Sequence, residues 1–172
     1  MLKGKRIAIL VEEDFEDAEL MVPLRAMKDA GASVVIVGSG SKSSYRGKRG
    51  SAEVKADTTA DRVDATEFDA IIIPGGYAPD KMRLHQAMID LVRKGHDAGK
   101  VIAAVCHGPQ LLISAGIVKG RHVTSWPSVE VDLKNAGATW VDEPVVKDGN
   151  IITSRKPADL PQFDEEIIRA LS

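Results

Sequence analysis

The chain has 172 residues, of which 44% are hydrophobic, 28% charged and 4% aromatic. Its 23 Lys and Arg residues and 25 Asp and Glu residues leave a formal net charge of −2, which argues against specific nucleic-acid binding and against affinity for anionic membranes. A single cysteine, Cys106, excludes an internal disulfide and fits a reducing compartment. The apolar runs are too short for a signal peptide or a membrane span, so we expect one cytoplasmic domain over residues 1–172.

Apolar runs and helical patterns alternate along the chain. Continuous runs rich in β-branched residues predict buried strands, and apolar residues at three- and four-residue spacing predict amphipathic helices. In the first half of the chain we expect a strand at 6–11, a helix at 17–30, a strand at 33–38, an exposed loop at 38–50, a short strand at 52–55 and a longer strand at 68–74. In the second half we expect a helix at 80–98, a strand at 101–106, a helix at 108–116, a strand at 122–126, a helix at 128–136, a hairpin at 141–155 and a helix at 159–171. This alternation predicts an α/β fold whose mainly parallel sheet is covered on both faces.

The strand at 101–106 runs into Ala104-Val105-Cys106-His107-Gly108, where a nucleophile stands between small residues at a strand-to-helix turn. This layout is typical of a nucleophile elbow. The N–H groups at the start of the next helix favour a thiolate over a thiol. His107 is a candidate base for Cys106. The alternatives are a buried structural cysteine and a surface histidine.

Two further strand ends carry candidate groups. Gly75 and Gly76 follow the strand at 68–74, and their amides suit an oxyanion hole shared with the amide of His107, although a plain turn is the alternative. The first strand runs into the acidic residues 12–19, which indicate helix capping or a metal site. We interpret most of them as capping, with one member reaching the thiol. We expect no metal ion and no organic cofactor.

No functional motif includes the basic residues of the 38–50 loop or the remaining histidines. The loop is expected to be solvated at Lys42, Arg46, Lys48 and Arg49. The histidines without a cysteine or acid at ligand spacing are His85, His96 and His122, for which we expect surface or structural roles.

Several motifs, spread nearly end to end, match one known family. They are Asp14-Phe15-Glu16-Asp17, residues 68–70 through Pro74-Gly75-Gly76, Cys106-His107-Gly108-Pro109-Gln110 with its flanks, Asn135-Ala136-Gly137, and Thr153-Ser154-Arg155 with Pro157 and Asp159-Leu160. In these motifs the chain resembles the PfpI family, the intracellular-protease-like branch of a superfamily named after a human parkinsonism-linked protein. The resemblance implies a flavodoxin-like three-layer sandwich of the class I glutamine amidotransferase type.

The resemblance also implies roles for individual residues. It places the nucleophile at Cys106, its partner at His107 and the acid beside the thiol at Glu16. A third carboxylate, supplied by a neighbouring subunit in members described as proteases, corresponds to Asp80, which implies a homodimer or homohexamer. Tyr77 and Trp126 are expected to line the substrate site.

The leading functional hypothesis is a stress-response hydrolase or lyase that acts on reactive carbonyls or glycated adducts through a Cys106 thiolate. One alternative is an intracellular cysteine peptidase with a Cys106–His107–Asp80 triad formed across subunits. Another is a redox-sensing or chaperone-like stress protein whose signal is oxidation of Cys106. The expected partners are a small carbonyl compound or a peptide.

Overall fold

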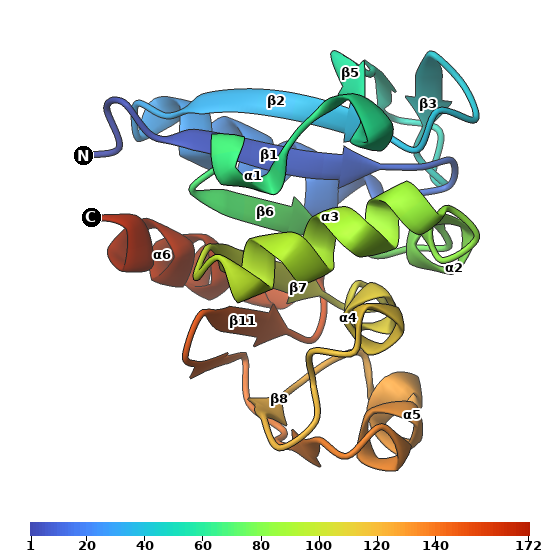
Figure 1. Cartoon of the computed structure of the whole chain (residues 1–172), viewed down its shortest axis with the longest axis vertical. Helices are drawn as coiled ribbons and strands as arrows, with labels where there is room; N and C mark the ends of the chain where they lie inside the picture. The colour runs from blue at the N-terminus through green and yellow to red at the C-terminus, as the bar shows by residue number, and fades with distance from the viewer.

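A seven-stranded sheet forms the centre of the computed structural model, which describes residues 1–172 (Figure 1). Its strand order is β10-β11-β7-β6-β1-β2-β5, and every neighbouring pair is parallel except the edge pair β10–β11. The strands of this sheet are β1 (Arg6–Val11), β2 (Ser33–Gly38), β5 (Thr58–Thr59), β6 (Ala70–Ile73), β7 (Val101–Val105), β10 (Val145–Asp148) and β11 (Ile151–Ser154). Two small ribbons pair β3 (Ser44–Arg46) with β4 (Glu53–Lys55), and β8 (His122–Val123) with β9 (Thr139–Trp140).

Helices cover both faces of the sheet, which makes the fold a flavodoxin-like three-layer sandwich. On one face α1 (Asp17–Asp29) packs against α6 (Leu160–Leu171). On the other face α3 (Gln86–Asp97) packs against α4 (Pro109–Ala115), and α3 crosses the sheet in front in Figure 1. The remaining helices are α2 (Ala78–Met82) and α5 (Glu130–Asn135), with 3₁₀ turns at Ala60–Arg62, Ala65–Glu67, Pro127–Val129 and Pro157–Asp159.

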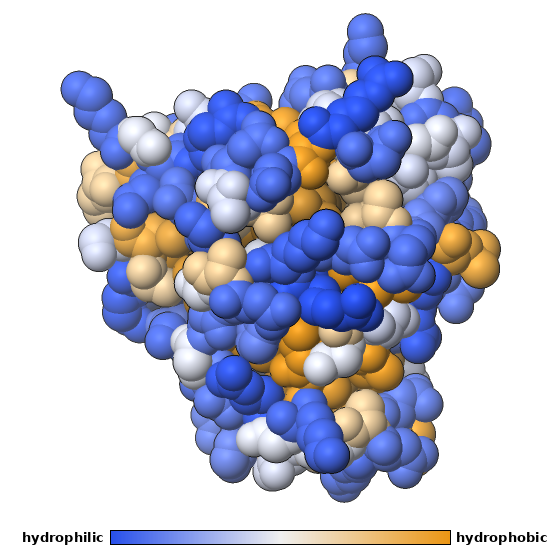
Figure 2. All heavy atoms as spheres, in the orientation of Figure 1, coloured by the Kyte–Doolittle hydropathy of each residue, from blue (hydrophilic) through white to orange (hydrophobic).

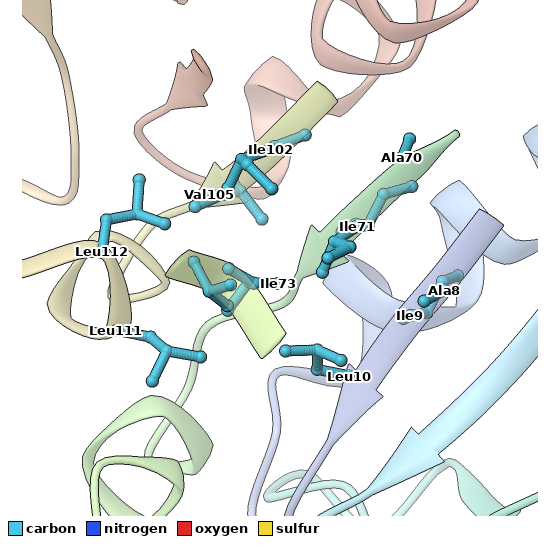
Figure 3. Close-up of a cluster of buried hydrophobic side chains, with 14 of the residues drawn as sticks. Ala8, Ile9, Leu10, Ala70, Ile71, Ile73, Ile102, Val105, Leu111 and Leu112 are labelled. Atoms are coloured by element: carbon cyan, nitrogen blue, oxygen red, sulfur yellow. The ribbon is translucent and has the colours of Figure 1, made fainter. Parts of the chain in front are cut away.

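The hydrophobic core lies between the sheet and its helices. Figure 3 shows side chains of β1, β6 and β7, among them Leu10, Ile73 and Val105, gathered with Leu111 and Leu112 of α4. These five side chains are all fully buried. The central strands carry apolar residues on both faces because helices cover both sides, and that explains their continuous hydrophobic runs. The face seen in Figure 2 is mainly hydrophilic.

The structure confirms the order of the expected elements, adds the two-residue strands β5 and β9, and differs from the expectation at three further places. The expected helix at 80–98 is two helices, α2 and α3, because His85 has an extended backbone (φ −112°, ψ 107°) through which no helix can continue. The expected strand at 122–126 ends at Val123, because the chain then turns to cover Cys106, where the amide of Trp126 donates to the Cys106 carbonyl (2.9 Å).

The third difference concerns the loop at 38–50, which is not simply solvated. It contains β3, and Tyr45 in that strand is only 1% exposed. The Tyr45 hydroxyl lies among the hydroxyls of Ser39 and Ser41, both of which donate to the carboxylate of Glu12. The loop is therefore fixed against the end of β1. None of the helices has the length and apolar composition that crossing a membrane requires.

Candidate active site

Cys106 stands directly after β7, between the carboxyl ends of β6 and β11. Its φ of +63° lies in the left-handed region that residues with a Cβ rarely adopt. The turn is held because the Cys106 amide donates to the Ser154 carbonyl (3.0 Å) and the Gly108 amide donates to the Val105 carbonyl (2.8 Å). A Cβ on Gly108 would lie 2.6 Å from the Ile73 carbonyl oxygen, so only glycine fits there. The backbone thus has the geometry of the predicted nucleophile elbow.

His107 lies where a base for Cys106 is needed. Its Nδ1 atom is 3.4 Å from the Cys106 sulfur. The imidazole is half-buried and stacks on the Trp126 ring, with 6.4 Å between centroids and 26° between planes. Burial, and then the charge of Lys48, lower the pKa of His107 below its usual value. The ring is therefore neutral at physiological pH and able to accept a proton.

The acid beside the thiol is Glu19, not Glu16. The Glu19 side chain is fully buried on the inner face of α1, and its carboxyl interacts with the Cys106 thiol. Its Oε1 accepts a hydrogen bond from the Gly75 amide (2.8 Å). Its Oε2 is buried without a partner. The expectation that Glu16 holds this place was wrong, because Glu16 precedes the helix and its side chain points to other partners.

Burial controls the protonation of this pair. It raises the pKa of Glu19 to about 8, with the nearby charge of Glu16 acting in the same direction. The Glu19 carboxyl is thus protonated at neutral pH and can donate a hydrogen bond to the sulfur. Burial also raises the pKa of the Cys106 thiol, while the amides of His107 and Gly76 act to lower it. Burial thus opposes the thiolate expected from the start of the short helix α4, while these amides favour it, and the neighbours of the sulfur are a neutral acid and a neutral imidazole.

The two glycines after β6 have different roles. The Gly75 amide is already used by Glu19, and a Cβ on Gly75 would lie 2.5 Å from Glu19 Oε1 and 2.9 Å from Cys106 Cβ. The amides of Gly76 and His107 interact with the Cys106 sulfur. Two of the three amides expected to form an oxyanion hole therefore face the reacting atom, while Gly75 positions the acid.

Glu16 belongs to a second, outer group of side chains, which we call the outer cluster (Glu16, Lys48 and Arg49). Its carboxylate accepts hydrogen bonds from Arg49 Nε (2.6 Å) and pairs with Lys48 Nζ (3.0 Å). Burial opposes the ionisation of Glu16, but hydrogen bonds from Arg49 and Lys48 outweigh it and hold the pKa below its usual value. Lys48 and Arg49 are exposed to solvent, as expected, and in addition both are paired with Glu16.

The remaining expected site residues lie around this centre. Tyr77 follows Gly76 and is 64% exposed, with Lys48 Nζ 5.1 Å from the centre of its ring. Trp126 is 39% exposed and covers His107. Asp80 is exposed in the first turn of α2 and is not joined to Cys106 or His107 within the chain. Side chains of His, Cys, Asp and Glu do not gather in any group of three or more that could hold a metal ion.

Sequence reasoning missed Glu19 as the acid at the thiol, although a signal was present. Glu19, Pro23 and Met27 follow one another at four-residue spacing and are all buried. An acid in register with the apolar face of an amphipathic helix points to the core rather than to solvent. The role of Lys48 had no comparable signal, because its partners come from distant parts of the chain.

Comparison with known proteins gives a consistent result. The model of the DJ-1/PfpI family matches residues 5–170. Deglycase PH1704 of Pyrococcus horikoshii is 43% identical over 166 residues, which are 96% of this chain and 99% of that protein. Putative cysteine protease YraA of Bacillus subtilis is 41% identical over 168 residues, which are 98% of this chain and 99% of that protein.

A solved structure agrees with these relatives. A two-domain protein from Anabaena variabilis, with DJ-1/ThiJ/PfpI-like and ferritin-like domains, has a TM-score of 0.96 and 45% identity. The match covers 98% of this chain and 48% of that one. Fold, motifs and sequence similarity along nearly the whole length lead to one conclusion: this chain belongs to the DJ-1/PfpI family.

Proposed function

We propose that the protein is a cysteine-dependent hydrolase or lyase of reactive carbonyl compounds and their glycated adducts, with Cys106 as the nucleophile. The observation that carries this proposal is the arrangement at the elbow, where one sulfur meets a neutral imidazole, a protonated carboxyl and two backbone amides. Such a set can form and stabilise a tetrahedral adduct of a small carbonyl. The deglycase name of the relative from Pyrococcus horikoshii supports this class of reaction.

The geometry supports a specific route for an α-oxoaldehyde. The Cys106 sulfur adds to the aldehyde carbon while its proton passes to His107 Nδ1, and the amides of Gly76 and His107 hold the new oxyanion. The adduct then loses the aldehyde C–H proton and gains a proton at the neighbouring carbon, which gives a 2-hydroxyacyl thioester. Water cleaves this thioester, releases a 2-hydroxy acid and restores the thiol. His107 and Glu19 are the groups that carry the protons.

The test is conversion of methylglyoxal to lactate in a buffer without primary amines. A parallel reaction starts from preformed methylglyoxal adducts of N-acetylarginine. Wild-type protein should form lactate, and Cys106→Ser should lose at least about a thousandfold in kcat/KM, since oxygen is a poorer nucleophile at this site. Folding of the variant is checked by its circular dichroism spectrum. Equal turnover by the two proteins would remove the thiol from the mechanism.

The second candidate function is a cysteine peptidase, which the exposed carboxylate of Asp80 favours. Asp80 projects from α2 next to Tyr77 and Leu84, which are 64% and 83% exposed. Hydrophobic side chains project beside α2 in Figure 2. A second copy of the chain that covered this surface would bring its Asp80 toward a Cys106–His107 pair, in a homodimer or homohexamer. The cysteine protease name of the relative from Bacillus subtilis supports this candidate.

The two candidates are separated by Asp80→Asn. Peptidase activity on a fluorogenic peptide should fall at least about a hundredfold in this variant, because the triad would lose the group that orients His107. Lactate formation from methylglyoxal should stay within about threefold. Sedimentation of wild-type protein gives the subunit number, and a monomer that cleaves the peptide would contradict the intersubunit triad.

A further inference from the structure

Lys48 is held close to the reacting atoms by the backbone, although it is 58 positions away from Cys106 in the chain. Its amide donates to the Phe15 carbonyl (2.8 Å), and Phe15 also forms bridges with Gly47 and with Gly76. Phe15 therefore lies between the segment that carries Lys48 and Gly76, whose amide faces the sulfur. Glycine fits at position 47 because a Cβ there would collide with the Asp17 carboxylate, which the backbone amides of the same loop hold in place.

The Lys48 side chain lies against Glu16 and Tyr77 and is only partly exposed. Its Nζ lies 5.1 Å from the centre of the Tyr77 ring, and the side chain is 26% exposed. Burial is the larger influence on the pKa values of Cys106 and His107, and the charge of Lys48 acts on both as well. The ammonium therefore lies beside the side chain that follows Gly76, at the edge of the Cys106 site.

The charges around Lys48 leave it able to take an anion. Its one carboxylate partner, Glu16, is shared with Arg49. Glu19 is neutral at physiological pH because its pKa is raised to about 8. The other acids of residues 12–19 have partners of their own. Glu13 pairs with Lys42, and Asp14 pairs with Lys81. Glu12 accepts hydrogen bonds from two serine hydroxyls, and Asp17 accepts them from the amides of the loop that carries Lys48. The outer cluster therefore has two cations for one carboxylate, which leaves a positive charge beside the site.

We propose that Lys48 is the anion-recognition group of the Cys106 site and that it selects α-oxoaldehydes, or their adducts, that carry a carboxylate. This proposal rests on the proposed function for its substrate class. The ammonium would exchange part of its contact with Glu16 for the carboxylate of the ligand, while Arg49 keeps Glu16 neutralised. A charge-assisted contact of this kind favours the anionic ligand over a neutral one of the same shape.

The first experiment needs no turnover and uses the single cysteine of the chain. Cys106 is alkylated with iodoacetate, which is anionic, and with iodoacetamide, which is neutral, and intact mass gives the two rates. Their ratio cancels the ionised fraction of the thiol, because both reagents react with the same thiolate. Relative to free N-acetylcysteine, wild-type protein should favour iodoacetate. Lys48→Gln should lower the ratio about three- to fivefold, as removal of one charge at this range predicts.

Matched variants isolate the charge of Lys48. Lys48→Arg should keep the wild-type ratio. Lys42→Gln removes the same charge from the same loop, where the side chain is 51% exposed and paired with Glu13, and should leave the ratio unchanged. A ratio that is equal in wild-type protein and Lys48→Gln, or that falls as much in Lys42→Gln, overturns the proposal.

The second experiment compares two substrates of matched length, 4,5-dioxopentanoate and the neutral 2-oxopentanal. The ratio of their kcat/KM values should fall about fivefold in Lys48→Gln and recover in Lys48→Arg. An unchanged ratio overturns the claim about substrate class. If wild-type protein converts neither compound, the proposed function fails, and the alkylation ratio still decides whether Lys48 recognises an anion.

Discussion

Each half of the site contains a buried glutamate, and the pKa values of the two carboxyls are shifted in opposite directions. Glu16 and Glu19 are three residues apart, and both are almost completely buried. Glu16, in the outer cluster, has two cationic partners and a lowered pKa. Glu19, in the inner group (Glu19, Gly75 and Cys106), has one backbone amide and no cation as a partner, and its pKa is raised to about 8. Burial alone therefore does not determine the charge of a carboxyl; its partners decide it.

The group that carries a proton and the groups that carry permanent charge therefore lie in different parts of the site. The inner group keeps a proton next to the sulfur, where a reaction intermediate needs one. The outer cluster holds permanent charges farther out, where they act on ligands and on the loop that carries them. Each half can be altered separately, which makes the distinction testable.

The largest effect is expected from changing the inner acid. Glu19→Ala should lower kcat/KM for methylglyoxal about a hundred- to a thousandfold, because the group that carries a proton to the adduct is lost. Glu16→Gln should cost less than about tenfold, since it removes an ion pair and no proton carrier. Parallel kinetics of the two variants measure this. A larger loss in Glu16→Gln would return the role of the acid to Glu16.

The next effect is a pH dependence of stability. Between pH 4.5 and about 8 the unfolded chain has released the Glu19 proton while the folded chain still holds it. The free energy of unfolding therefore falls as the pH rises through this range. Glu19→Gln removes this loss and should be more stable than wild-type protein at pH 8, by up to about 4 kcal/mol, with little difference at pH 4.5. Urea denaturation at the two pH values checks it.

Asp164 of α6 offers a matched control outside the site. Burial raises its pKa to about 7, and its Oδ1 is buried without a partner. Asp164→Asn should therefore also be more stable than wild-type protein at pH 8, by the same sign argument. Its kcat/KM should stay at the wild-type value, unlike that of Glu19→Gln. A loss of activity in Asp164→Asn would show that the pH effect and the chemistry cannot be separated in this way.

A smaller effect is expected at the anchor of the outer loop. Asp17 accepts hydrogen bonds from the amides of Arg49, Ser51 and Ala52 and from the Ser51 hydroxyl. Asp17→Ala should lower the free energy of unfolding by about 2 to 3 kcal/mol, because these donors lose their acceptor. It should also lower the iodoacetate preference of Cys106, since Lys48 lies on the same loop. Asp29→Ala, at an exposed position of the same helix, should change neither.

The smallest effect is expected at the solvent-exposed pair Lys42–Glu13. The two side chains are 51% and 27% exposed. Surface pairs contribute little to stability. Lys42→Gln should therefore change the Tm by less than about 2 °C. A thermal scan checks this, and a larger shift would mean that the outer loop depends on more than the Asp17 anchor.

Much of the fold could be predicted because its signals are local. The continuous apolar runs of β1, β2, β6 and β7 and the glycine stops of the helices each lie within a few neighbouring residues. The split between α2 and α3 could not be read in this way, because the residues around His85 are compatible with a helix. The two helices are separated at His85, whose backbone is extended and whose ring lies 3.7 Å from the Glu12 carboxylate at the end of β1.

The candidate site also has one part that could be predicted from local sequence and another part that could not. The sequence by itself determined the elbow at Cys106, the following His107 and the glycine pair, because each is a property of a few consecutive residues. Only the tertiary structure decided that Glu19 meets the Gly75 amide 56 positions away and that Glu16 meets Arg49 33 positions away. The protonation of a carboxyl and the partner of a lysine depend on burial and on charges from distant segments, which become neighbours only when the chain folds.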